Sequence, residues 1–111
     1  MINGNEFGRL SATCLEDLNR GLDPLADDHE VEILYQAGVL TLEIEEPALS
    51  KIIISPNSSA NQVWISAQAT SFKLDWLPGK KSFVLPSTGE TLNQLVGRLV
   101  GEELGVETFK F

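Results

Sequence analysis

The chain has 111 residues, of which 42% are hydrophobic and 22% are charged, a composition typical of a small globular domain. We therefore expect one domain over residues 1–111, long enough to bury roughly two thirds of the surface of its unfolded chain. The formal net charge of −8 at pH 7 argues against nucleic acid or an anionic membrane as a partner, because both require a basic footprint.

The sequence also limits where we expect the protein to be located and what its cysteine can do. No apolar run approaches the ~20 residues of a membrane span. The first residues have neither a basic region nor an apolar stretch, so we expect no secretory signal and predict a cytoplasmic protein. The single cysteine, Cys14, excludes an internal disulfide and any multi-cysteine zinc or iron–sulfur site within one chain.

The first predicted element is an amphipathic helix that begins at Asn3, whose side chain can cap it in a box with Glu6. Its apolar stripe consists of Phe7, Leu10, Cys14, Leu18, Gly21 and Leu22. Pro24 disfavours helical geometry at the residue before it. We therefore predict that this helix ends near Leu22 and that Leu25 packs from the loop that follows.

Alternation of apolar and polar residues then predicts about six short strands with brief connections. They cover residues 31–36, 39–45, 51–55 and 82–85, and the two halves of a central hairpin over residues 62–76. A turn at Ala37-Gly38 joins the first two into an antiparallel hairpin.

A second amphipathic helix is predicted after Thr91, which forms a capping box with Gln94, and Gly105 is a natural stop for it. The apolar tail, residues 106–111, is expected to fill the gap between the helices and the sheet. The resulting order of elements implies an α+β fold, a two-layer sandwich with both helices on one face of an antiparallel sheet of about six strands. The other face of the sheet is then open to solvent.

Both tryptophans lie in the predicted central hairpin. Because side chains alternate across a strand, Trp64 lies on the face opposite to Val63 and Ile65. If those two face the core, Trp64 is exposed, which suggests a binding surface because tryptophan is enriched at interface hot spots. The opposite register, with Trp64 in the core, is the alternative that burial statistics favour for an arbitrary sequence. Trp76 is predicted to face the core.

The sequence contains no catalytic template. Its one histidine, His29, lies in a charged stretch, and there is no nucleophile elbow, phosphate-binding glycine loop or dinucleotide-binding fingerprint. We therefore do not expect an enzyme.

Acidic residues are concentrated in the first half of the chain. Residues 1–50 hold eleven acids against two bases, whereas residues 51–111 hold five acids against six bases. Clustered, exposed carboxylates suit oxygen-preferring cations such as Fe²⁺, Fe³⁺, Mn²⁺ or Ca²⁺, and they bind them weakly when no buried cage fixes the coordination. The candidate metal ligands are Glu16, Asp17, Asp23, Asp27, Asp28, Glu30 and Glu32. The same residues can instead form a solvated acidic face, or dock onto a basic surface of another protein.

One known family shares these features. The segment Gln62-Val63-Trp64-Ile65-Ser66, followed by Asp75-Trp76, resembles the central signature of the frataxin family of the bacterial CyaY type. The Gly38-Val39-Leu40-Thr41 segment and the order of elements extend the resemblance over nearly the whole chain. It implies the same two-layer α+β fold.

The resemblance also implies a function, that of an iron-binding regulatory or iron-donor protein of iron–sulfur cluster assembly. In frataxins an acidic ridge on the first helix and first strand binds Fe²⁺ or Fe³⁺ weakly and contacts a cysteine desulfurase. The open sheet face meets the scaffold protein and the desulfurase. By position, the seven acids above form the ridge, and the partner-binding residues are Gln62, Trp64, Ser66 and Lys73. The resemblance further implies a monomer without metal that can oligomerise with iron.

Some positions depart from the family pattern. Asn19 and Arg20 stand where many members have further acids, Gly8 replaces a histidine found in some bacterial members, and Ala60 stands where many eukaryotic members have asparagine. The part of the ridge on the first helix therefore holds fewer acids than in many members, which affects the expected strength of iron binding. Two alternatives stay open: an acidic protein-interaction module that regulates a partner without metal, and a ferroxidase, which would need a defined metal site.

Overall fold

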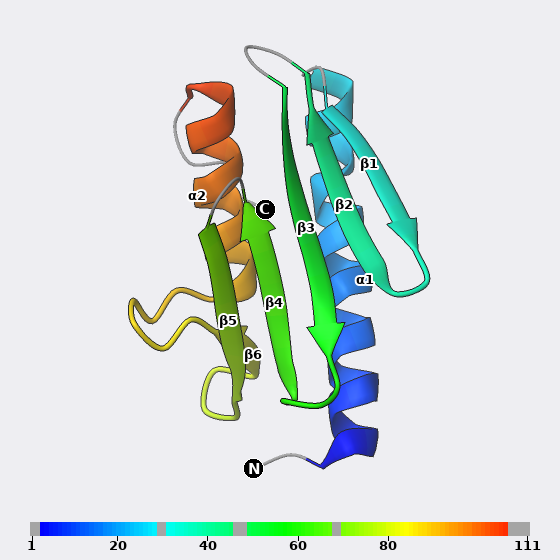
Figure 1. The fold of residues 1–111 in the computed structure, drawn as a ribbon, viewed down its shortest axis with the longest axis vertical. Helices are drawn as coiled ribbons and strands as arrows, with labels where there is room; N and C mark the ends of the chain where they lie inside the picture. Colours follow the sequence, from blue (N-terminus) through cyan, green and yellow to red (C-terminus); the bar gives the residue numbers. More distant parts are fainter. Residues whose placement is uncertain (1–2, 29–30, 46–48, 68–69, 107–111) are drawn as a thin grey trace.

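The computed structural model describes residues 3–28, 31–45, 49–67 and 70–106. Their helices and strands form two layers (Figure 1). The elements are α1 (Gly4–Asp28), β1 (Val31–Gln36), β2 (Val39–Ile44), β3 (Ser50–Asn57), β4 (Gln62–Ala67), β5 (Thr70–Leu77), β6 (Ser82–Val84) and α2 (Leu92–Leu104). The strands form one antiparallel sheet in chain order, and both helices lie behind the same face of it in Figure 1. The predicted α+β sandwich is confirmed.

The register of the sheet places alternate side chains of each strand against the helices. Leu42 of β2 lies opposite Ile52 of β3, and Leu40 lies opposite Ile54, which in turn lies opposite Ile65 of β4. All five are buried. Burial of an aliphatic side chain of this size contributes about 1.5–3 kcal/mol, so rows of this kind fix the register, because a slip by one residue would expose them all.

Helix α1 extends further than its sequence predicts. It continues through Pro24 to Asp28, so the predicted end near Leu22 is wrong. Leu25 has no exposed surface, and its burial offsets the hydrogen bond that Pro24, which has no amide hydrogen, cannot make. Pro24 itself is exposed, so its ring lies away from the core.

The buried stripe of α1 differs in detail from the predicted one. Leu15 is fully buried beside Leu18 and Leu22, whereas Cys14 lies only partly within the core. Burial, together with the nearby Asp17 carboxylate, raises the pKa of the Cys14 thiol. None of the described helices is both long enough and apolar enough to cross a membrane.

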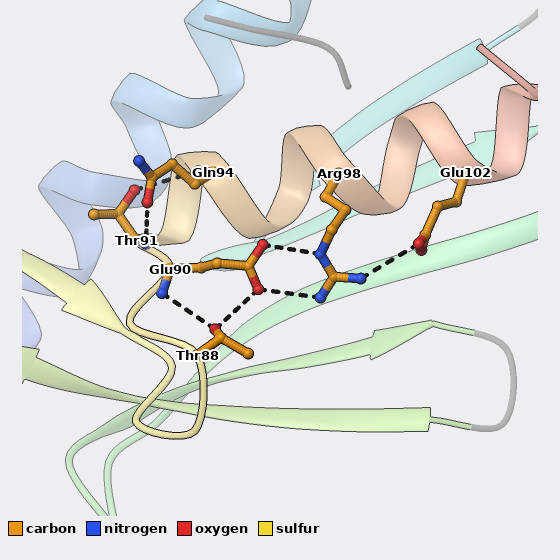
Figure 2. A network of polar contacts seen from close by, with 6 residues as sticks. All are labelled: Thr88, Glu90, Thr91, Gln94, Arg98 and Glu102. Carbon is orange, nitrogen blue, oxygen red and sulfur yellow. Dashed lines mark hydrogen bonds and ion pairs between the residues drawn. The ribbon is translucent and has the colours of Figure 1, made fainter. Parts of the chain in front are cut away.

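A polar network holds the start of α2 to the loop before it (Figure 2). The backbone N–H of Thr91 donates to the side-chain Oε1 of Gln94 at 2.9 Å, and the backbone N–H of Gln94 donates to Thr91 Oγ1 at 3.3 Å. These two hydrogen bonds confirm the predicted capping box. One turn later, Arg98 donates from Nε and Nη2 to the two carboxylate oxygens of Glu90, at 2.8 and 3.1 Å. Its Nη1 also donates to Glu102 at 3.3 Å. The Arg98 hydrogen bonds lower the pKa of Glu90, and Glu90 raises the pKa of Arg98.

The predicted stop of the second helix is also confirmed. Gly105 adopts φ 71° as the C-terminal cap, a left-handed conformation that glycine adopts without steric cost. The next residue, Val106, is 52% exposed, which does not fit the expected packing of the tail. The rest of that tail, residues 107–111, lies outside the described residues.

Candidate partner-binding face and acidic helix

The sheet face away from the helices is covered by no other described element (Figure 1). Gln62, Trp64 and Ser66 of β4 point to this face, because Val63 and Ile65 between them are 0% and 1% exposed on the helix side. The register that places Trp64 on the open face is therefore confirmed, and the alternative that buries it in the core is wrong. Lys73 of β5 lies directly opposite Trp64, so all four predicted partner-binding residues share the open face.

The indole of Trp64 makes two side-chain contacts, one at its N–H edge and one over the face of its ring. Its Nε1–H donates a hydrogen bond of 2.9 Å to Gln62 Oε1. Lys73 Nζ lies 4.9 Å from the ring centroid, a cation–π geometry that contributes about 0.5–1 kcal/mol at an exposed site. Gln62, Trp64 and Lys73 thus form one contact cluster. Ser66 lies two residues along the same strand and takes no part in these contacts.

Asp75 extends this cluster through Gln62, and sequence reasoning missed it as a site residue. It lies opposite Gln62 across β4 and β5, and its Oδ1 accepts a 2.9 Å hydrogen bond from Gln62 Nε2. The available signal was the pairing register of the predicted hairpin. A register that places Trp64 opposite Lys73 also places Gln62 opposite Asp75.

The surroundings of the cluster are small, polar or isolated apolar side chains. Ser66 lies between Ile53 of β3 and Ser71 of β5. Leu34 of the edge strand β1 is 50% exposed on the same face. Because tryptophan is enriched in the middle of protein–protein interfaces, Trp64 is the side chain of this face best suited to contact a partner.

Trp76 lies on the helix face of the sheet, as predicted, and is partly buried. Its ring packs edge-on against Phe83 of β6, with centroids 5.3 Å apart. Phe83 in turn meets Phe7 of α1 edge-on at 5.8 Å. Trp76 therefore links the end of the sheet to the helical layer.

The predicted metal ligands are distributed over α1 and β1. Glu16, Asp17, Asp23 and Asp27 are exposed on α1. Glu32 of β1 is exposed on the open sheet face, since its neighbours on that strand point inward. The side chain of Asp28, and Glu30 as a whole, lie outside the described residues.

The helical acids form a line and not a cage. At 100° per residue, Glu16, Asp23 and Asp27 fall within about 40° of one another around α1, but Glu16 and Asp27 are separated by roughly 16 Å along the axis. Asp17 pairs with Arg20. Among the side chains that the structure describes, no three acids, histidines or cysteines come close enough together to hold a metal ion. The line of acids can attract cations to the surface, and no tight site is built from its described members.

Comparison with known proteins identifies the family. The model of the frataxin-like domain matches residues 1–106. The chain belongs to the frataxin-like family. One relative, the iron-sulfur cluster assembly protein CyaY of Azotobacter vinelandii, is 24% identical over 95 residues, which cover 84% of each chain. A solved structure of frataxin from Psychromonas ingrahamii matches with a TM-score of 0.81 over 97% of each chain, at 17% identity, a likeness of fold.

Proposed function

We propose that this frataxin-like protein is a regulatory protein of iron–sulfur cluster assembly, which docks through its open sheet face on a cysteine desulfurase and its scaffold protein. The assembly role is supported by the related CyaY protein named for that process. The observation that carries the docking proposal is the Trp64 indole, held by Gln62 and Lys73 at the centre of a sheet face that no described element covers.

The contacts of Trp64 favour binding for two physical reasons. Its indole N–H already has an acceptor in Gln62, so a partner that covers the ring leaves no donor unsatisfied. The ring is also held in one orientation before the partner arrives, which reduces the loss of side-chain entropy on association. A central, preorganised tryptophan of this kind can contribute about 2 kcal/mol or more to an interface.

The proposal also includes iron, bound at the acidic surface of α1 that is formed by Glu16, Asp17, Asp23 and Asp27. The exposed carboxylates of α1 support weak binding of Fe²⁺ or Fe³⁺, because hard cations prefer oxygen ligands and no buried cage is needed for transient capture. The alternative is an acidic interaction module that regulates its partner without metal. Ferroxidase chemistry receives no support from these residues, since it needs a defined metal site.

The docking proposal is tested with Trp64→Ala against purified cysteine desulfurase and scaffold protein in a binding assay. We expect this variant to bind at least about tenfold more weakly than the wild type, the factor that corresponds to 1.4 kcal/mol. Leu49→Ala is the matched control, because Leu49 is 82% exposed outside the strands and its truncation also removes apolar surface. Equal affinities for Trp64→Ala and the wild type would refute docking through this face.

Anaerobic titration with Fe²⁺, followed by amide chemical shifts, separates the iron-binding proposal from its alternative. We expect shifts along residues 16–32 and none on α2. A triple variant, Glu16→Gln, Asp23→Asn and Asp27→Asn, should lose most of the response on α1. Shifts that centre on Glu102 and Glu103, or that spread evenly over the chain, would contradict the assignment of iron to the acidic surface.

A further inference from the structure

The hydrogen bonds of Gln62 connect Trp64 to the neighbouring strand. Its Oε1 accepts from Trp64 Nε1 at 2.9 Å, and its Nε2 donates to Asp75 Oδ1 at 2.9 Å. The amide therefore uses one end for the indole and the other for the carboxylate. The three side chains form a relay that runs along β4 and then across to β5.

The two ends of the Gln62 amide are not interchangeable in this relay. The indole N–H can only donate, and a carboxylate can only accept. If the amide were rotated by half a turn, its NH₂ group would face the donor of Trp64 and its oxygen would face the oxygens of Asp75. Asp75 therefore selects the orientation that presents Oε1 to the indole. Ser55, opposite Trp64 on the other side, makes no described contact that could replace this selection.

The positions of the relay on the sheet make this selection rigid. Gln62 and Asp75 are directly paired residues of antiparallel strands, and Trp64 and Lys73 are the next pair on the same face. The backbone hydrogen bonds of the sheet fix the distance between the two pairs. The indole is consequently held along its edge through Gln62 and over its ring by Lys73.

We propose that Asp75 is a positioning residue for Trp64, which orients the Gln62 amide and thereby holds the indole in the one orientation that the partner meets. Asp75 then acts on binding through Gln62 and need not touch the partner itself. The inference rests on the proposed docking function of the open sheet face.

The test in the free protein uses the indole N–H resonances of ¹⁵N-labelled variants. Asp75→Ala removes the acceptor, whereas Asp75→Asn keeps a neutral oxygen that can still accept from Gln62 Nε2. In Asp75→Ala we expect the Trp64 indole N–H to exchange with water about two- to tenfold faster, the factor expected for the loss of one hydrogen bond. In Asp75→Asn we expect a smaller increase, because the donor of Trp64 still favours the same orientation of the Gln62 amide. The Trp76 indole is the internal control, and Ser71→Ala, a change on the same strand and face, should leave both signals unchanged. Wild-type exchange at Trp64 in Asp75→Ala would overturn the proposal.

A double-mutant cycle then tests whether Asp75 acts through Gln62. Asp75→Ala should weaken binding to the desulfurase and scaffold about two- to tenfold in the wild-type background, and have no further effect in Gln62→Met. An equal loss in both backgrounds would show a direct or long-range electrostatic role and overturn the positioning role. If Trp64→Ala binds as the wild type does, the docking function fails, while the exchange experiment still decides whether Asp75 holds the indole.

Discussion

The two tryptophans of the chain are both partly buried but lie on opposite faces of the sheet, and this difference leads to different expectations for their removal. Trp76 packs against Phe83 on the helix side, so Trp76→Ala should lower the free energy of unfolding by about 3 kcal/mol. Trp64→Ala removes one exposed cation–π contact and one hydrogen bond, and should cost about 1 kcal/mol. Urea melts of both variants measure these values. A larger loss for Trp64→Ala would contradict the assignment of faces.

How far single residues were predictable depended on the range of the contacts involved. Alternation placed Trp64 opposite Val63 and Ile65, but the residues alone left open which of these two faces meets the core, and the family resemblance favoured an exposed Trp64. The role of Asp75 did not follow, since it requires the pairing of Gln62 with a residue on another strand. Of the acidic set, exposure on α1 was predictable, but the spacing of those side chains in space was not.

At the scale of elements, the strands were easier to predict than the end of α1. Strand positions follow from alternation, which is a local pattern, and the structure places them within about two residues of the expected ranges. The predicted end of α1 was wrong because Pro24 disfavours the helix only through its local backbone, whereas the burial of Leu25 depends on packing against the rest of the core. The tertiary contact outweighed the local preference.

Pro24 gives a prediction about the stability of α1. Pro24→Ala restores an amide hydrogen that can bond within the helix, and Pro24 is exposed, so no packing is lost. We expect the free energy of unfolding to rise by about 1–3 kcal/mol. Thr13→Ala, at another exposed position of α1, reports the ordinary gain from alanine and should stay below about 1 kcal/mol. An unchanged or lower stability of Pro24→Ala in denaturant melts would contradict this interpretation of the helix end.

The polar network before α2 gives a pH-dependent prediction. The pKa of Glu90 is lowered in the folded state, so its contribution to stability is present above the unfolded pKa of about 4.3 and is lost as pH falls through the lower folded value. Glu90→Gln should therefore destabilise the protein by about 1 kcal/mol at pH 7. The difference from the wild type should shrink steadily below about pH 4. A difference that is the same at pH 7 and pH 3 would show that the charge of Glu90 is not its cause.

At the scale of the whole molecule, the excess of negative charge should act against the compact state. The net charge is −8, and the exposed acids of α1 include only one, Asp17, with an ion pair among the described contacts. The melting temperature should therefore rise as NaCl is increased from about 10 to 150 mM, because the screening length falls from roughly 30 to 8 Å. The double variant Asp23→Asn and Asp27→Asn should show a smaller rise. A fall with added salt would show that favourable ion pairs dominate.

The open sheet face and the acidic surface of α1 are different parts of the same small molecule. A partner that covers the sheet around Trp64 can leave the helical acids in solvent, so docking and cation capture need not exclude each other. The two properties are therefore separable by mutation. Variants of the open face should change partner binding, and variants of α1 should change the cation response.

The most direct test of the central claim is a cross-saturation NMR experiment on the deuterated, ¹⁵N-labelled protein bound to the unlabelled desulfurase and scaffold. Protons of the partner attenuate only those signals of this chain that lie in the interface. We predict the strongest attenuation at the Trp64 indole N–H and at the amides of Ser66 and Lys73. Attenuation confined to exposed residues of α2, such as Asn93 and Gln94, with the Trp64 indole unaffected, would contradict docking through the open sheet face.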